Sequence, residues 1–512
     1  MAESTVSNNN KKIAKNTLFL YLRMGAVLLI SLYVTRAALR VLGAEDYGIY
    51  NVVCGFVTLF GALNLSLATC INRFYNYEIG KGDVGNLSIV YNTAIIIQLI
   101  IAFFLFIILE TIGLWYLNYR MVIPIEKVQT ANIIYHISVI SLIFTVMQSP
   151  FTAAVLSFEK MNFYAIVSII DVFLKLGIVL LLPIKGFDTL LLYAILLGLI
   201  SLVNFFLYFT YCKIKFKQLV FSFVYKRFVF KSMMSFIGWN FLDPISYNVR
   251  GQGCNILLNA FFGPIINAAY TISNQVATAL DTFTVSISTA FRPQLIQSYS
   301  AANYERSTKL ILSMSKIMYC LYLMISLPVI IEVEYLFNLW LVDFPRYAVD
   351  FTILILIIKQ LNVLNPALTT SVMASGNIKK YSIVSCFTIC SIIPLSCFFL
   401  KYNHNPNLVY FLMIILTILN QVFCVRITCK LVHGLNLKIY FFKVLVPCFV
   451  QSMFLIPLVL LSSLFFTGFL RLVLVCLCSV VLSVLFFYLF VLNKEEKMLA
   501  NNLVISVKGR YL

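Results

Sequence analysis

Long apolar runs alternate with short polar segments along the whole chain. A helix needs about 20 predominantly apolar residues to cross about 30 Å of hydrocarbon, and the runs have this length. The segments between them are too short to hold an inserted soluble domain. The pattern predicts fourteen membrane helices, at 16–39, 48–72, 88–112, 130–157, 163–183, 188–212, 232–259, 265–291, 309–331, 349–374, 381–400, 408–429, 440–463 and 468–492.

Composition supports an all-α integral membrane protein. Hydrophobic residues make up 61% of the chain and charged residues 11%, whereas soluble domains are about 45–50% apolar and about 25% charged. The net charge of +19 comes from Lys and Arg clusters between the apolar runs. Such clusters orient membrane proteins, so no nucleic-acid partner is expected. The 13 Cys contain no CxxC pair and the 3 His are scattered, so no metal site is expected.

The placement of the basic clusters also predicts the topology. Lys and Arg concentrate in alternate connections, beginning with Lys11, Lys12 and Lys15 before the first run. Because cytoplasmic connections carry this excess, both termini are expected in the cytoplasm. The first run is too long for a cleaved signal and lacks a clear small-residue cleavage site.

The basic segment at 213–231 falls at the midpoint of the predicted helices. Gly43 is followed by Tyr50 and then Arg73 at nearly the same spacing as Gly263 is followed by Tyr270 and Arg292. This repeat is expected for two pseudo-repeated lobes around a central cavity. The predicted parts are a six-helix lobe at 1–212, a cytoplasmic linker at 213–231, a second six-helix lobe at 232–431, and two additional helices with a tail at 432–512.

Charged residues inside the predicted spans are the candidates for function. Each costs roughly 2.5–3.5 kcal/mol at the bilayer centre, so they are expected to face water or one another. Helical spacing places Asp243 and Arg250 on one face, and Asn274 and Asp281 on another. The bases exceed the acids by one, which favours an anionic ligand. The predicted cavity residues are Arg23, Arg250, Lys359, Asn240, Asn274 and Asn362.

The remaining charges have alternative readings. Asp171 and Lys175 are four residues apart and could form a local ion pair. Asp243 could neutralise Arg250, whereas Asp281 has no basic residue near it in sequence and could hold a cation or a proton. We assign these two aspartates, with Asp171 and Lys175, to ion coupling or charge balance. Arg73 and Arg292 end their spans and are expected to anchor them at the membrane interface.

Several segments resemble bacterial polysaccharide flippases of the Wzx type, which belong to the multidrug/oligosaccharidyl-lipid/polysaccharide (MOP) exporter superfamily. The similar segments are spread over the chain: "NTLFLYLRMGAVLLISLYVTRAALRVLGAEDYGIYNVV" near the N-terminus, "NRFYNYEIGKGD" at 72–83, "QSPFTAAVLSFEKMNFYA" at 148–165, "FFGPIINAAYTISNQV" at 261–276 and "SGNIKKYSIVS" at 375–385.

The resemblance implies a flippase that moves an undecaprenyl-pyrophosphate-linked oligosaccharide across the bacterial inner membrane by alternating access. Arg23 and Arg250, from the first helix of each lobe, would hold the pyrophosphate. The last two helices would border a groove for the lipid tail. The resemblance implies a monomer that contacts a polysaccharide polymerase. It implies no cofactor other than a coupling H⁺ or Na⁺.

Two other functions are compatible with the sequence. A cation-coupled exporter of drugs or other small molecules would have the same fold. A polysaccharide polymerase would need an extended outer loop, and the longest outer connection, near 332–348, is short and acidic. No Walker A motif is present, so direct coupling to ATP hydrolysis is not expected. We therefore expect a transporter and not an enzyme.

Overall fold

The described part of the chain is helical throughout. The computed structural model describes residues 61–119, 125–182, 188–219, 222, 225–341, 344–493 and 496–498, with scattered positions between 19 and 57. No strand occurs among these residues. Parts of the predicted spans 16–39 and 48–72, together with both terminal tails, including Lys11, Lys12 and Lys15, fall outside this set.

Ten of the described helices are long and apolar enough to cross a membrane, in agreement with a multi-pass membrane protein. In chain order the helices are α2 (Gly61–Lys81), α3 (Val84–Ile108), α4 (Leu114–Tyr119), α5 (Val128–Ser157), α6 (Met161–Leu181), α7 (Thr189–Lys215), α8 (Arg227–Phe262), α9 (Pro264–Ser300), α10 (Tyr304–Ile331), α11 (Val333–Trp340), α12 (Ala348–Asn362), α13 (Asn365–Ser375), α14 (Lys379–Cys390), α15 (Ile392–Leu400), α16 (Asn407–Leu431), α17 (Leu437–Tyr440), α18 (Val446–Ser462) and α19 (Gly468–Phe486).

Three helices extend well beyond their predicted apolar runs. The structure continues α2 from 72 to Lys81 and α9 from 291 to Ser300, and it begins α8 at Arg227. The apolar run ends where polar residues begin, but the backbone stays helical past that point. At 36 residues, α8 is about 54 Å long.

The helices form two compact units. Unit 1 comprises Met1–Phe241 and Arg292–Asn303, and unit 2 comprises Leu242–Phe291 and Tyr304–Leu512. The long helices α8 and α9 therefore each contribute to both units. The predicted division at 1–212, 213–231, 232–431 and 432–512 remains a prediction.

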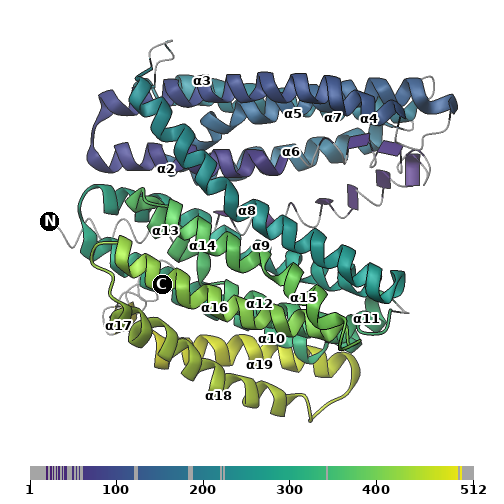
Figure 1. Ribbon diagram of the computed structural model, residues 1–512, viewed down its shortest axis with the longest axis vertical. Coiled ribbons are helices and arrows are strands. Elements are labelled where there is room, and N and C mark those ends of the chain that lie inside the picture. The colour runs from purple at the N-terminus through teal and green to yellow at the C-terminus, as the bar shows by residue number, and fades with distance from the viewer. Residues whose placement is uncertain are drawn as a thin grey trace, which may run out of the picture. The chain divides into compact units, whose positions relative to one another are not determined.

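In unit 1, α5 is the central helix. It packs against α2, α3, α6 and α7, and Figure 1 shows α3, α5 and α7 side by side. Tyr135 and Val139 of α5 are fully buried in the core that these helices share. Side chains of Asp83 and Asp188 cap α3 and α7 by accepting hydrogen bonds from backbone N–H groups.

In unit 2, two helices have many neighbours. α16 packs against α12, α13, α14 and α15, while α10 packs against α12, α18 and α19. Leu327, Leu455 and Val475 belong to one apolar cluster that joins α10 to the last two long helices. These two helices are therefore built into unit 2 by direct packing on α10.

Polar contacts also tie α19 and the segment after it to α10. Arg471 of α19 donates from Nε and Nη2 to Oε2 of Glu332, at 3.0 and 2.7 Å, just after α10 ends. Near the start of α10, Lys316 pairs with Glu496 at 2.9 Å. Lys316 lies within the predicted span 309–331, and its side chain is only 1% exposed.

Candidate functional site

Asp171 and Lys175 form the local ion pair that their spacing allows. The Lys175 ammonium lies 2.7 Å from Oδ2 of Asp171, one turn earlier on α6. Asn204 of α7 donates to the other carboxylate oxygen, also at 2.7 Å. The pair borders a cavity of about 390 Å³ in unit 1, which Ser138 and Ser141 of α5 also line. The positive and negative charges of this cavity therefore balance.

Arg23 lies against α6 without a carboxylate among its described partners. Its guanidinium carbon is 4.9 Å from the centre of the Tyr164 ring, and Nη1 reaches the hydroxyl oxygens of Tyr164 and Ser168 at 3.5 Å. Its Nε is buried without a hydrogen-bond partner in the structure. The ring face and the hydroxyls stabilise the cation but do not neutralise it.

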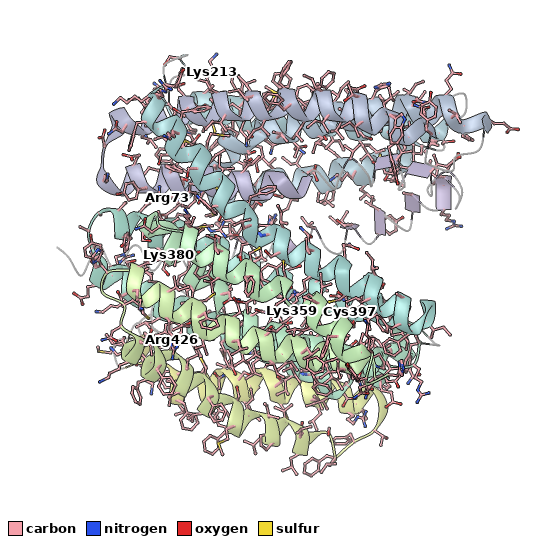
Figure 2. The ribbon with its side chains drawn as sticks, in the orientation of Figure 1. Arg73, Lys213, Lys359, Lys380, Cys397 and Arg426 are labelled. Atoms are coloured by element: carbon pink, nitrogen blue, oxygen red, sulfur yellow. The ribbon has the colours of Figure 1, made fainter. Side chains whose placement is uncertain are left out.

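Arg73 is buried and Arg292 is half-buried, and both lie within continuing helices rather than at helix ends. Their anchoring at the membrane interface remains a prediction. Arg73 is 7% exposed and stacks on the rings of Phe74, Tyr77 and Phe236 at 4.6 to 5.1 Å (Figure 2). Arg292 donates to the Thr69 hydroxyl at 3.4 Å. Arg73 is covered because α2 continues past it as helix and packs within unit 1.

An amide network surrounds the same end of α2. Asn76 donates to Asn72, which in turn donates to the Ser157 hydroxyl at 2.9 Å. Gln297, near the end of α9, donates to Asn76 and to the Ser157 carbonyl at 2.9 and 2.8 Å. A Cβ at Gly80 would collide with the Gln297 backbone, so α2 and α9 touch closely here.

Asn240 is also part of unit 1 and is 4% exposed. Its side chain hydrogen-bonds the buried thiol of Cys70 on α2. In unit 2, Asn274 donates to the carbonyl of Tyr270, one turn earlier on its own helix, at 2.8 Å. Each of these predicted cavity residues thus has a protein partner in the structure.

Asp281 has a basic partner that its own helix does not supply. Its Oδ2 pairs with the ammonium of Lys359 on α12, whose position Figure 2 labels. The two side chains are 31% and 25% exposed. Lys359 and Asp281 were predicted for different roles, as a substrate ligand and an ion site, and the structure joins them in one neutral pair.

Asp243 and Arg250 share a helix face but are not paired. Oδ1 of Asp243 accepts a hydrogen bond from the Ser385 hydroxyl of α14 at 2.5 Å. The Arg250 guanidinium lies 5.0 Å from the centre of the Tyr247 ring, and no carboxylate pairs with it among the residues that the structure describes. The alternative in which Asp243 neutralises Arg250 therefore finds no support in these contacts.

Arg250 and Asn362, both predicted cavity residues, line the same cavity in unit 2. This cavity has a volume of about 10 Å³, and Thr417 and Asn420 of α16 complete its polar wall. Asn420 was not a candidate because its only sequence signal is one amide in an apolar run. Its importance comes from the packing of α16 against α12 and α14.

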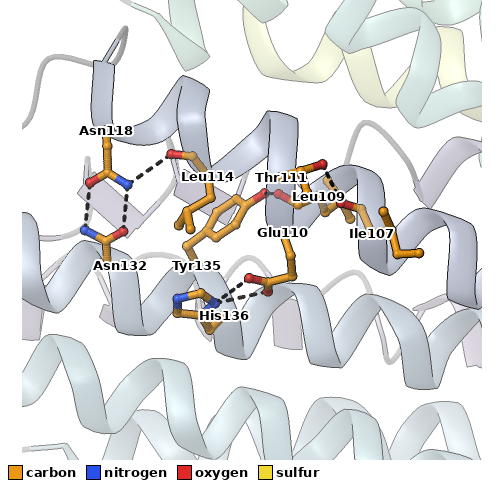
Figure 3. Close-up of polar contacts among 9 residues, drawn as sticks. All are labelled: Ile107, Leu109, Glu110, Thr111, Leu114, Asn118, Asn132, Tyr135 and His136. Atoms are coloured by element: carbon orange, nitrogen blue, oxygen red, sulfur yellow. Dashed lines mark hydrogen bonds and ion pairs between the residues drawn. The ribbon is translucent and has the colours of Figure 1, made fainter.

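A second group that the sequence did not single out lies between α3 and α5 (Figure 3). The helix α3 continues into one π-helical turn at Leu109–Gly113, and Glu110 in that turn contacts Nδ1 of His136 at 2.9 Å. The Tyr135 hydroxyl donates to the Leu109 carbonyl at 2.7 Å. Such π-helical turns redirect side chains, and here the turn brings Glu110 to α5.

Comparison with known proteins shows which solved structures share this fold. No family model and no curated protein matches the sequence. A multidrug resistance MATE family transporter of the MOP superfamily, solved in an outward-facing conformation, superposes with a TM-score of 0.71 over 83% of this chain and 96% of its own, at 15% identity.

A MOP superfamily transporter from Pyrococcus furiosus, described as having a binding pocket of reverse polarity, gives a TM-score of 0.67 over 82% of this chain and 95% of its own, also at 15% identity. The P26A mutant of a MATE protein gives 0.70 at 14% identity. The chain thus has the fold of MATE family transporters of the MOP superfamily. The narrower resemblance to polysaccharide flippases remains a prediction.

Proposed function

We propose that this protein transports an anionic, lipid-linked substrate across a membrane, and specifically that it flips an undecaprenyl-pyrophosphate-linked oligosaccharide. The observation that carries the proposal is the balance of charge inside the helices. Asp171 with Lys175 and Asp281 with Lys359 form neutral pairs. The guanidinium groups of Arg23 and Arg250 have no carboxylate partner among the described residues.

Uncompensated guanidinium groups favour a phosphate-bearing ligand. Arg23 and Arg250 are both half-buried, where a cation is stabilised by a counter-charge, and guanidinium offers paired N–H donors that match phosphate oxygens. Arg23 lies in unit 1 and Arg250 in unit 2, so each unit contributes one such guanidinium group. Asn240, Asn274 and Asn362 would supply weaker hydrogen bonds to the glycan, and Lys359 would add charge when its pair with Asp281 opens.

The remaining parts of the proposal concern ion coupling, charge balance, location and partners. Asp243 has a hydroxyl but no basic residue as a described partner, so it is the proposed group for a coupling H⁺ or Na⁺. Asp171, Lys175 and Asp281 would serve charge balance. The protein would act as a monomer in the bacterial inner membrane, with both termini cytoplasmic, and would pass its product to a polysaccharide polymerase.

The test is translocation of the lipid-linked oligosaccharide in cells that depend on this chain for surface glycan. Removing the charge with Arg23→Gln or Arg250→Gln should lower translocation at least about tenfold, the effect of losing about 1.4 kcal/mol of binding. Lys401→Gln removes one positive charge from an exposed connection and is the matched control. Normal surface glycan in both arginine variants, at equal membrane levels of protein, would contradict the proposal.

The alternative is a cation-coupled exporter of small molecules. Its support is the fold, because one structural neighbour is described as a multidrug resistance transporter. Purified protein in liposomes separates the two functions. Exchange of a cationic drug for H⁺ or Na⁺ without any glycan lipid would favour the exporter.

A further inference from the structure

The cavity beside Arg250 is small and its polar wall consists mainly of hydrogen-bond donors. It lies within unit 2, among α8, α12, α14, α15 and α16, and its volume of about 10 Å³ is close to the minimum for one solvent-sized particle. A pyrophosphate group is much larger than this space. The cavity therefore calls for an occupant other than the proposed transport substrate.

The two amides in the wall are oriented by hydrogen bonds to their oxygens. Oδ1 of Asn362 accepts from Nδ2 of Asn365 at 3.1 Å, and Oδ1 of Asn420 accepts from the Cys424 thiol at 3.6 Å. The Nδ2 atom of Asn362 is buried without a hydrogen-bond partner in the structure. Asn362 thus keeps its NH₂ group available to an occupant.

The local charge is positive and has no counter-ion in the wall. Asp243 lies seven residues before Arg250, about 10 Å along α8, and accepts a hydrogen bond from Ser385. Asp281 is paired with Lys359. Arg250 is half-buried, and no carboxylate pairs with it among the residues that the structure describes, so an anion in this cavity would stabilise unit 2.

We propose that this cavity binds one monovalent inorganic anion of the size of chloride or bromide, held by Arg250 and by the amides of Asn362 and Asn420. Chloride accepts several N–H bonds at once and cancels the single charge of Arg250. Met413 lines the same wall, and its flexible side chain allows the cavity to fit an ion slightly larger than water. This site shares Arg250 and Asn362 with the proposed transport site, so a halide bound here would have to leave before these residues hold the substrate.

Thermal unfolding of the purified full-length chain, without any substrate, tests the site. At equal ionic strength, the unfolding midpoint should be higher in sodium chloride or bromide than in sodium gluconate, and the increase should saturate with halide concentration. A halide at ten times its Kd multiplies the folded population about elevenfold relative to the unfolded one. Equal midpoints in all three salts would show that the cavity holds only water and would overturn the proposal.

An isosteric variant links the effect to the cavity. Asn420→Asp places a carboxylate beside Arg250 without changing the side-chain size, so the halide dependence should disappear. Asn118→Asp makes the same change at an exposed position of α4, and its halide dependence should match the wild type. If Asn420→Asp does not fold, Asn362→Asp serves the same purpose. Halide dependence that survives in the folded cavity variant would place the ion elsewhere.

Diffraction from crystals grown in bromide gives a direct readout. The anomalous signal of bromine should appear beside Arg250 in the wild type and be absent in the Asn420→Asp variant. Ordered bromide only at the protein surface would overturn the assignment.

Discussion

The Asp171–Lys175 pair of unit 1 is built differently from two charged pairs of unit 2. In unit 1, Asp171 and Lys175 stand four residues apart on α6. In unit 2, Asp281 with Lys359 and Glu332 with Arg471 join segments that are far apart in sequence. A local pair stabilises one face of one helix, whereas a long-range pair holds two helices together. The cost of breaking a pair should therefore depend on what it connects and on how far its charges are from water.

The largest effect is expected at the pair of Arg471 with Glu332 in unit 2. Arg471→Met leaves the Glu332 carboxylate, whose side chain is 0% exposed, without its counter-charge, and removal of one partner of a buried pair costs about 3–5 kcal/mol. The free energy of unfolding, measured by denaturation in detergent, should fall by this amount. Adding Glu332→Gln to Arg471→Met should recover much of the loss, because no charge is then left buried. If Arg471→Met alone is as stable as the wild type, the pair of Arg471 with Glu332 does not stabilise the fold.

A smaller loss is expected when the pair between α9 and α12 is broken. Asp281→Asn leaves the Lys359 ammonium unpaired, at a cost of about 2 kcal/mol, because both side chains retain some exposure and water can partly compensate. The exchanged double variant, Asp281→Lys with Lys359→Asp, should restore most of the stability. If the exchange fails while the single variant is tolerated, the two residues do not act as a pair.

The pair at the start of α10 gives a pH-dependent version of the same test. Burial raises the pKa of Glu496, but hydrogen bonds from the Asn493 backbone, Lys316 and Ser313, with the Lys316 charge, outweigh it and lower that pKa below the usual 4.5. Because the folded pKa is lowered, this stabilisation is present above about pH 4.5 and is lost as the pH falls through the folded pKa.

Glu496→Gln should therefore lower the free energy of unfolding at pH 7 by about 1–2 kcal/mol. The difference from the wild type should shrink as the pH falls from 5 toward 3. A difference that stays constant over this range would mean that the carboxylate charge contributes nothing.

The smallest effect is expected at the local pair of unit 1. Asp171→Asn should cost less than about 1 kcal/mol, because the Lys175 side chain is already 41% exposed and its ammonium can turn to water. Asn204 can still hydrogen-bond the new amide. The same denaturation experiment compares this variant with Asp281→Asn. A loss equal to or larger than that of Asp281→Asn would reverse the proposed difference between the units.

Much of the fold could be predicted from the sequence. The apolar runs predicted an all-helical membrane protein, and the described helices from α3 onward coincide with the predicted spans apart from their ends. The ends were less predictable where polar residues continue a helix. The runs ended near Arg73 and Arg292, but α2 and α9 continue past both, and Arg73 is buried against aromatic rings.

The candidate site was predictable only in part. Spacing along one helix correctly indicated the contact of Asp171 with Lys175. It could not indicate that Lys359 is the partner of Asp281, or that Asn420 stands beside Arg250, because these residues come from separate helices. The shared face of Asp243 and Arg250 suggested a pair that the structure does not form.

The sequence by itself determined that the chain is helical and multi-pass, because the length of an apolar run and the thickness of a membrane are compared one segment at a time. Only the tertiary structure decided which charges are neutralised and which are not. A side chain finds its partner across helices that approach each other through packing, and no single segment carries that information. The guanidinium groups of Arg23 and Arg250 became the centre of the functional proposal for this reason.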